Sequence, residues 1–200
     1  MTDLEPGRRE RKKQATRDDL MDHAARLFAA RGFDAVTTAD IAEAADVSQR
    51  TFFRHFPSKE AVLYGHAHEL REGMLAAFAA RPADEPVVES VIAAVGTIAG
   101  FYADSRAEAF LQARLAAEFS SVAAHARAHV QSEWEHELTA AIAARLGVDP
   151  LADPGPEILT GAAFAAYRAA VRRWAAGGGR DDFADLLDES LAVLGQFAGR

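Results

Sequence analysis

Hydrophobic positions recur every three or four residues along the chain, and no segment shows the alternation of a β-strand. The pattern predicts a first helix with an apolar face from Leu20 to Phe28 and an end at Gly32. Glycines and prolines delimit the later helices, which are expected at 58–81, 87–103, 106–119, 122–146, 157–176 and 181–197. The sequence therefore predicts an all-α protein.

Two of these predicted helices have distinct properties. The helix at 87–103 is apolar around nearly its whole circumference, which indicates burial on most sides and a central position. The helix at 58–81 is expected to leave the N-terminal part of the chain without interruption until Arg81-Pro82. We expect this long helix to transmit motion between the two parts of the protein.

The segment 37–60 predicts two short helices joined by a tight turn. Thr37 followed by Asp40 is a variant of the capping box, so a helix is expected to begin near Thr38. Asp46 tolerates turn dihedrals, and Ser48 can cap a second helix that runs to about residue 56.

The second short helix has an apolar and a polar face. Phe52 and Phe56 lie one turn apart and are expected to pack on the first short helix. No Asp or Glu lies between Val47 and Ser58, and the other faces carry hydrogen-bonding side chains from Gln49, Arg50, Thr51, Arg54 and His55. Such a helix can enter a DNA major groove, about 12 Å wide. The alternative is a helical hairpin that only packs, which needs neither the polar cluster nor the absence of acids.

Three runs of this segment, VTTADIA at 36–42, DVS at 46–48 and TFFRHFPSKE at 51–60, resemble the TetR family of bacterial regulators. The resemblance covers about residues 15–65. It implies that one set of side chains approaches DNA, namely Thr38, Ser48, Gln49, Arg50 and Thr51. It implies that Phe53, His55 and Lys59 lie beside the DNA backbone.

Two positions depart from the family pattern. Many members have Gly where this chain has Arg50 and Tyr where it has Phe53. Arg50 can donate two hydrogen bonds to guanine O6 and N7, which makes it our candidate specificity residue. A phosphate contact or a bond to Asp46 is the alternative role of Arg50. The missing hydroxyl at Phe53 removes one potential hydrogen bond to a phosphate.

The net charge of −8 is unevenly distributed. Residues 1–60 carry eleven acidic and eleven basic side chains, whereas residues 61–200 carry nineteen and eleven. Six bases crowd the start of the chain, namely Arg8, Arg9, Arg11, Lys12, Lys13 and Arg17. We expect three regions: a basic flexible arm at 1–14, a helix-turn-helix head at 15–62 and a helical body at 63–200. The arm either tracks phosphates, enters a minor groove or only solubilises the chain.

The family resemblance implies that the body binds an unidentified small apolar or amphipathic effector, with no cofactor. The candidate ligand-binding residues are Phe78, Phe101, Tyr102, Phe110, Gln112, Phe119, Trp134, Phe164, Tyr167 and Arg168. Each aromatic among them can equally be core. Arg168 and Arg172 can meet an anionic ligand group, or they can pair with acidic helices.

The resemblance also implies that the last two helices pair with their copies in a homodimer. Small residues suited to close approach are Ala162, Ala163, Ala166 and Ala170, and residues suited to burial are Phe183, Leu186, Leu187, Leu191, Leu194 and Phe197. The same leucines can instead belong to the core of one subunit. Two heads about 34–36 Å apart would read successive major grooves of a palindromic site.

Other chemistry finds little support in the sequence. There is no cysteine, no hydrolase elbow and no H-E-x-x-H pair, so no catalytic residue and no enzyme activity is predicted. The glycine run 177–179 follows no strand and is expected to stop a helix. His125, His129 and His136, with Glu133 nearby, are more typical of surface or pocket histidines than of a metal site. The longest uncharged run, 90–103, is short for a bilayer span, so we expect a cytoplasmic protein.

These features together favour a homodimeric transcriptional repressor that binds double-stranded operator DNA at an inverted repeat. A small molecule in the body is expected to release it by changing the spacing or tilt of its heads. The alternatives are an effector-independent activator or architectural DNA binder and, with less support, a helical carrier or enzyme that kept a vestigial reading head.

Overall fold

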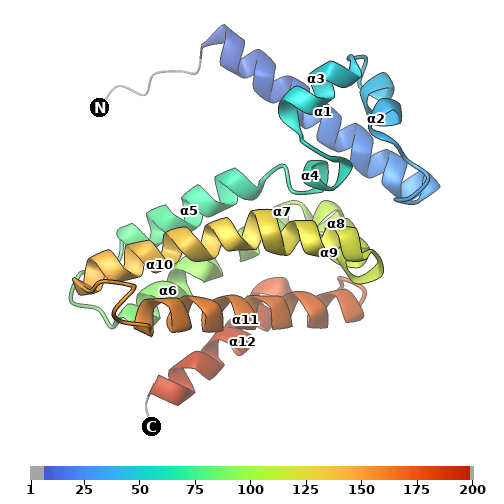
Figure 1. Cartoon of the computed structure of the whole chain (residues 1–200). Coiled ribbons are helices and arrows are strands. Elements are labelled where there is room, and N and C mark those ends of the chain that lie inside the picture. Colours follow the sequence, from blue (N-terminus) through green and yellow to red (C-terminus); the bar gives the residue numbers. More distant parts are fainter. Residues whose placement is uncertain (1–6, 199–200) are drawn as a thin grey trace. The chain divides into compact units, whose positions relative to one another are not determined.

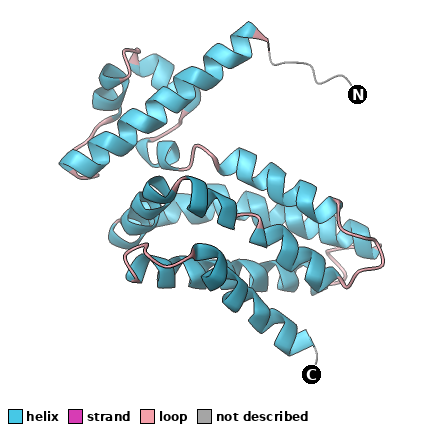
Figure 2. Cartoon of the chain, turned by 180° about the vertical axis from the view of Figure 1, so that it is seen from behind, coloured by secondary structure: helices cyan, strands magenta, loops and turns pink. Residues whose placement is uncertain are grey.

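The computed structural model describes residues 7–198, within which all secondary structure is helical (Figure 2). The all-α prediction is confirmed. The chain divides into two compact units, Met1–Gly65 and His66–Arg200. We call them the N-terminal unit and the C-terminal unit, and Figure 1 labels their helices.

Between residues 7 and 65 the N-terminal unit contains four helices, α1 (Arg8–Arg31), α2 (Thr38–Ala44), α3 (Gln49–His55) and α4 (Lys59–Leu63). Helix α1 packs against α2 and α4, and α2 packs against α3. The buried side chains between them come from all four helices and include Leu20, Phe28, Ile41, Phe52 and Val62. Gly32 ends α1 as predicted, with a φ of +82°.

The long helix predicted at 58–81 is wrong, because the chain turns at Tyr64–His66 between α4 and α5 (Ala67–Ala79). Glycine is a poor helix former. Gly65 lies so close to Met21 of α1 that a Cβ there would meet the Met21 side chain. Its carbonyl accepts a hydrogen bond of 2.8 Å from the Arg17 guanidinium. The break therefore depends on contacts of Gly65 with Met21 and Arg17 of α1, which is distant in the sequence.

The C-terminal unit contains the remaining helices. They are α5, α6 (Val87–Gly96), α7 (Ala99–Asp104), α8 (Arg106–Glu118), α9 (Ser120–His125), the π-helical segment η1 (Ala126–Gln131), α10 (Ser132–Leu146), α11 (Gly155–Ala176) and α12 (Phe183–Ala198). Helix α9 runs through η1 into α10, so the helix predicted at 122–146 begins two residues earlier and contains a π-helical segment that was not predicted.

The single helix predicted at 87–103 is also wrong, because a turn at Thr97 and Ile98 separates α6 from α7. The Thr97 hydroxyl donates to the carbonyl of Ala94 at 2.7 Å, a local bond of the kind that competes with the helical ladder. The predicted central position holds for α6, which packs against α5, α11 and α12.

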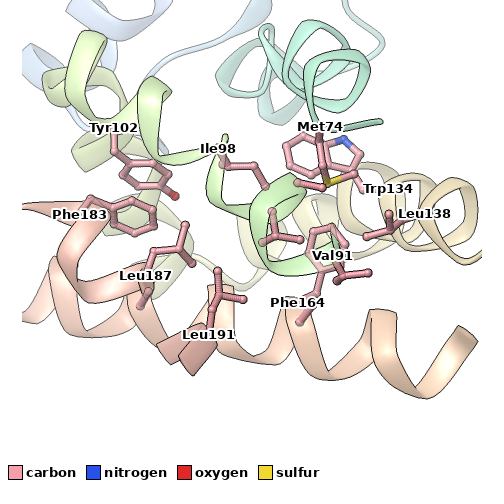
Figure 3. Packing of buried hydrophobic residues seen from close by; sticks show 14 of the residues in the cluster. Met74, Val91, Ile98, Tyr102, Trp134, Leu138, Phe164, Phe183, Leu187 and Leu191 are labelled. Atoms are coloured by element: carbon pink, nitrogen blue, oxygen red, sulfur yellow. The ribbon is translucent and has the colours of Figure 1, made fainter. Parts of the chain in front are cut away.

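Buried side chains from several helices form one cluster around α6 (Figure 3). Val91 and Val95 of α6, Leu138 of α10, Phe164 of α11 and Leu187 of α12 are all fully buried. The stretch Val87–Asp104 is apolar and long enough to cross a membrane by length and composition alone, with a mean hydropathy of 1.4. Packing of α6 in this core accounts for its apolar composition.

A partly buried polar cluster joins the ends of α5, α6 and α10. The Arg145 guanidinium donates to Ser90 Oγ at 2.6 Å and to the carbonyl of Phe78 at 2.8 Å. Ser90 is fully buried and donates to Glu85, which in turn pairs with Arg81. The hydrogen bonds from Arg81 and then Ser90 lower the pKa of Glu85 to about 2.

The glycine run 177–179 stops α11, as predicted, and its geometry requires glycine. Gly178 and Gly179 have φ values of +73° and +66°, in the left-handed region that favours glycine. A Cβ on Gly179 would lie 2.7 Å from the ring of Phe110. The Arg106 Nε donates to the Gly179 carbonyl at 2.7 Å, which holds the loop on α8.

Gly179→Ala is expected to destabilise the C-terminal unit by about 1–3 kcal/mol, through the left-handed backbone and the contact with Phe110. The matched control is Gly73→Ala in the middle of α5, where an added Cβ meets nothing within 4 Å. This control should stabilise by about 0.5–1 kcal/mol, because alanine is the better helix former. Urea unfolding followed by circular dichroism measures both, and equal effects of the two substitutions would contradict the prediction.

Candidate nucleic-acid interface

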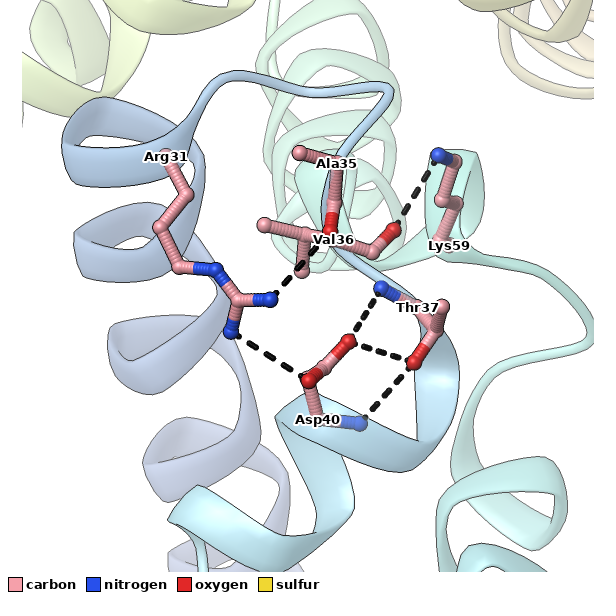
Figure 4. Close-up of polar contacts among 6 residues, drawn as sticks. All are labelled: Arg31, Ala35, Val36, Thr37, Asp40 and Lys59. Carbon is pink, nitrogen blue, oxygen red and sulfur yellow. Dashed lines mark hydrogen bonds and ion pairs between the residues drawn. The ribbon is translucent and has the colours of Figure 1, made fainter.

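Helix α2 begins with the predicted capping box (Figure 4). Thr37 Oγ1 accepts from the Asp40 amide at 3.1 Å, and the Asp40 carboxylate accepts from the Thr37 amide at 2.8 Å. The Arg31 guanidinium donates to the same carboxylate at 3.2 Å. The hydrogen bonds from Thr37, with a smaller contribution from Arg31, lower the pKa of Asp40 to about 2. Three hydrogen bonds to this carboxylate, from the Thr37 amide, the Thr37 hydroxyl and Arg31, fix where α2 starts.

This lowered pKa predicts an acid-dependent loss of stability in the N-terminal unit. The folded state binds the Asp40 proton less tightly than the unfolded chain, so the ionised carboxylate stabilises the fold above the ordinary pKa of 3.8. The contribution disappears as the pH falls towards about 2. Asp40→Asn is therefore expected to be less stable than wild type at pH 7 and to match it near pH 2. Urea midpoints at pH 7, 4 and 3 measure the difference, with the exposed Asp34→Asn as a control that should follow wild type at each pH.

The turn between α2 and α3 also follows the prediction. Asp46 has a φ of +51°, and it is the one non-glycine residue with positive φ among those described. The amide of Val47 donates to the carbonyl of Ala42 at 2.9 Å. Ser48 Oγ then accepts from the Thr51 amide at 3.1 Å and caps α3. These contacts orient α3 across α2, the arrangement of a helix-turn-helix.

Helix α3 buries one face and exposes the other. Phe52 is fully buried, and Phe56 follows one turn later with its ring centroid 5.9 Å from that of Phe52. Phe53, by contrast, is 50 % exposed. Ser48, Gln49, Arg50 and Arg54 are exposed as well, whereas Thr38 and Thr51 are half-buried. The structure thus collects most of the predicted DNA-contacting side chains on one accessible surface.

Some of these side chains bond with each other. Gln49 Nε2 donates to Thr38 Oγ1 at 2.9 Å and so links α3 to the start of α2. The hydroxyls of Ser48 and Thr51 lie 3.0 Å apart. Arg50 has neither a hydrogen bond nor an ion pair with another described residue, so the alternative bond to Asp46 is not formed. Its guanidinium is available to an external partner.

Two predicted contacts, His55 and Lys59, point into the N-terminal unit. The Lys59 ammonium donates to the carbonyls of Phe33 and Val36 at 2.9 and 3.2 Å, and it lies 4.2 Å from the centre of the Phe33 ring. His55 Nε2 is buried and has no hydrogen-bond partner among the described residues. Burial, followed by the charges of Arg54, Arg17 and Lys13, lowers the pKa of His55. Lys59 therefore supports the unit, and the ring nitrogen of His55 is turned away from solvent, neither of which sequence reasoning predicted.

Arg17 is a second supporting residue that the sequence did not identify. Its guanidinium donates to the carbonyls of His55 and Gly65 at 3.3 and 2.8 Å and lies 4.4 Å from the centre of the Phe56 ring. The sequence groups Arg17 with the basic residues at the start of the chain, yet its side chain bonds α1 to the end of α3. Only its spacing of three residues before the buried Leu20 could have signalled an inward position.

The predicted flexible arm at 1–14 is corrected by the structure. Helix α1 begins at Arg8, so residues 8–14 are helical. Residues 1–6 lie outside the described part of the chain. An uninterrupted helix through this region follows from its composition, since Arg, Lys, Gln, Glu and Ala are good helix formers.

In the C-terminal unit, five of the ten candidate ligand residues form a continuous series of ring contacts, namely Phe101, Tyr102, Tyr167, Phe164 and Trp134. The hydroxyls of Tyr102 and Tyr167 lie 2.9 Å apart, and burial raises the pKa of Tyr167. Tyr102 also stacks on Phe183 at 3.5 Å between ring centroids.

The other candidate ligand residues have different contacts, and Phe110 reaches the series only through Trp174, whose ring also contacts Tyr102. Phe78 packs under the Arg145 guanidinium and Phe110 against Trp174. Gln112 donates to Glu108, and Phe119 is half-buried at the end of α8. Arg168 forms an ion pair of 3.1 Å with Glu135, which is the pairing with an acidic helix that the sequence left as an alternative.

The candidate histidines and the candidate interface residues of the last two helices have the following surroundings. His125 and His129 have ring centroids 4.9 Å apart, but no group of three or more metal-binding side chains occurs among the described residues. Phe183, Leu187 and Leu191 of α12, with Ala163 and Ala170 of α11, are buried within the C-terminal unit itself. These five are therefore core residues. Ala162, Ala166, Leu186 and Leu194 are half-buried, and the side chain of Phe197 lies outside the described part.

Comparison with known proteins identifies both units. Residues 20–64 match the bacterial regulatory proteins of the tetR family, and residues 85–198 match the MftR C-terminal domain. The second match alone covers more than half of the chain.

Three similar proteins illustrate the relationship. The transcriptional regulator TcmR of Streptomyces glaucescens is 49% identical over 80 residues, which are 40% of this chain and 35% of TcmR. The transcriptional repressor KstR2 of Rhodococcus jostii (strain RHA1) is 45% identical over 51 residues, which are 26% of this chain and 25% of KstR2. The match thus spans about a third or less of these relatives. The fold is also similar to the crystal structure of Thermus thermophilus FadR, a TetR-family repressor in complex with lauroyl-CoA, with a TM-score of 0.56. The two sequences are 28% identical, and the match covers 89% of this chain and 92% of FadR.

Proposed function

Because this chain belongs to the TetR family of bacterial transcriptional regulators, we propose that it is a repressor that binds an inverted-repeat operator as a homodimer and leaves it when a small effector binds. The family is one of regulators and not of enzymes. A regulator of this kind acts on DNA in the cytoplasm.

The observation that carries the proposal is the exposed face of α3. This face carries the exposed side chains of Gln49, Arg50 and Arg54. The opposite face of α3 is packed into the unit through the fully buried Phe52. The capping box at Thr37 and the left-handed Asp46 hold this helix against α2. Side chains presented in this way can reach base edges, while nearby donors reach phosphates.

A second DNA-binding head is required for an inverted repeat. Two heads separated by about 34–36 Å contact successive major grooves on the same face of DNA. Val193 of α12 is 43 % exposed, and the half-buried Leu186 and Leu194 lie on the same helix. We propose that this part of α12, with the small residues of α11, pairs with a second copy. Sedimentation that gives only monomers at micromolar concentration would contradict the dimer.

The effector is proposed to be apolar or amphipathic. The series of aromatic rings from Phe101 to Trp134 supplies apolar surface, and the hydroxyl pair of Tyr102 and Tyr167 supplies polar groups within it. Thermus FadR, in its crystal structure, binds lauroyl-CoA. A fatty acyl thioester is therefore the first effector to test. A ligand that converts a mostly bound population to a mostly free one must differ in affinity between the two states by about 5 kcal/mol.

Footprinting on the DNA upstream of the chain's own gene tests the proposal. A protected site with two inverted half-sites is expected, and lauroyl-CoA or another acyl thioester is expected to abolish the protection. If an acyl thioester binds by calorimetry but does not alter the footprint, the chain is a DNA-binding regulator and the proposed effector response is contradicted. Protection accompanied by higher transcription would indicate an activator, and the absence of any specific footprint would contradict the repressor altogether.

A further inference from the structure

The first two turns of α1 extend beyond the packed part of the N-terminal unit. Helix α1 has 24 residues, yet its first half-buried side chains are Thr16 and Arg17 and its first fully buried one is Leu20. The described side chains of residues 8–15 are all exposed. A helical segment without packing of its own is marginal in water, so its retention as helix depends on continuity with the packed part of α1.

This segment, residues 8–15, is the α1 extension, and it is strongly basic. Five of its first six residues are Arg or Lys, with Glu10 as the single acid. Arg9 and Lys13 precede Arg17 by eight and four residues and therefore lie on the same stripe of the helix. Arg17 is bonded to the end of α3 through the carbonyl of His55. The basic stripe thus begins beside the proposed reading helix and continues for about 12 Å beyond Arg17.

The charge of Lys13 acts at the same place. It is one of the three cationic side chains that lower the pKa of His55, together with Arg54 and Arg17. Lys13 precedes Arg17 by one helical turn, so it lies on the side of α1 that Arg17 turns towards the end of α3. The basic stripe of α1 and the polar face of α3 form one positively charged surface, because α3 contains no acidic residue.

From this geometry we propose that the α1 extension is a rigid phosphate-binding element that grips the DNA backbone outside the base pairs read by α3. The inference rests on the proposed operator binding, since it assigns a further part of the same interface. An α-helix with its side chains is about 10–12 Å wide, whereas the minor groove is about 6 Å wide. The extension therefore cannot enter a minor groove as a flexible arm can, and its arginine and lysine side chains contact phosphates without reading sequence.

The salt dependence of DNA binding tests this assignment. A plot of log affinity against log salt concentration has a negative slope, and each phosphate contact that is lost lowers the magnitude of this slope by about 0.9. Arg9→Gln/Lys13→Gln is expected to lower the slope by about 1.8 per protomer, equally on operator and random duplexes. The matched control is Arg114→Gln/Arg127→Gln, which removes the same charge from exposed positions of the C-terminal unit. An unchanged slope in the first variant, or equal changes in both, would overturn the inference.

A second variant separates a rigid helix from a flexible arm. Ala15→Pro keeps every basic residue but breaks α1 between Lys13 and Arg17, because proline removes a helical amide and clashes with the preceding turn. We expect it to lower the salt slope about as much as the double substitution. Ala15→Gly is its milder control and should retain most of the slope. A wild-type slope in Ala15→Pro would show that charge without helical presentation suffices, and would overturn the rigid element.

These outcomes are distinguishable from failure of the proposed function. If wild type shows no preference for any operator, the repressor proposal fails before the variants are compared. If wild type protects an operator and the variants of the α1 extension keep its salt slope, only the present inference fails. Circular dichroism melting of each variant checks that the N-terminal unit remains folded.

Discussion

Replacing Phe52 by alanine is expected to unfold the N-terminal unit and abolish operator binding. Phe52 is fully buried between α3 and the other helices of a unit of 65 residues. Removal of a buried phenylalanine ring costs about 3–5 kcal/mol, from lost hydrophobic transfer and the cavity left behind. A unit of this size has only about 3–5 kcal/mol of stability from its own core. The cost is therefore comparable to the whole stability of the unit.

The neighbouring Phe53 provides the matched control. It has the same side chain, one residue along the same helix, but is 50 % exposed. Phe53→Ala should cost less than about 1 kcal/mol of stability, while it weakens DNA binding if this ring lies beside the backbone as predicted. Thermal unfolding followed by circular dichroism, together with operator titration, measures both quantities. Similar melting of the two variants would contradict the assignment of the buried and exposed faces of α3.

Arg50→Ala is expected to cost about 1–3 kcal/mol of operator affinity at each half-site, because a bidentate contact with guanine is lost. In a homodimer the substitution acts at both half-sites. We therefore expect the loss of operator affinity to be smaller only than the loss caused by unfolding in Phe52→Ala. The loss should be much smaller on random duplex DNA of the same length. Stability should stay within about 0.5 kcal/mol of wild type, since Arg50 is exposed and bonds to no other described residue.

Titration of operator and random duplexes over a range of salt concentrations measures this specificity. Arg26→Ala serves as the control, because Arg26 is an exposed arginine of the same unit that lies along α1 and pairs with Asp22. An equal loss on operator and random DNA would identify Arg50 as a phosphate contact and leave base reading to other side chains of α3.

Within the DNA-binding region, local features followed directly from the sequence. The cap at Thr37, the left-handed Asp46 and the cap at Ser48 were all predicted and found. The buried Phe52 and the exposed Arg50 also lie where helical periodicity placed them. Each of these features depends on residues within about one helical turn, so the sequence contains the whole interaction. Contact of these residues with DNA remains a prediction.

The side chains that turn inward could not be assigned in the same way. His55, Lys59 and Arg17 are polar residues in a region rich in DNA-contact candidates, and their spacing suits an outward position. The side chains of Arg17 and Lys59 instead donate to carbonyls 23 to 48 residues away in the chain, and His55 Nε2 is buried without a hydrogen-bond partner among the described residues. In the C-terminal unit, the partners of Arg168 and of the two tyrosines were likewise unpredictable, because they lie on other helices.

The sequence by itself determined the helical class, the capped helix-turn-helix and the apolar and polar faces of α3, because these arise from local hydrogen bonds and from a period of 3.6 residues. Only the tertiary structure decided where the long helices break and which cations support the fold. The close approach of Gly65 to Met21, the bond from Arg17 to its carbonyl and the grip of Arg145 on Ser90 join residues far apart in the chain. Burial requires such polar groups to find a partner, and only the folded chain brings that partner near.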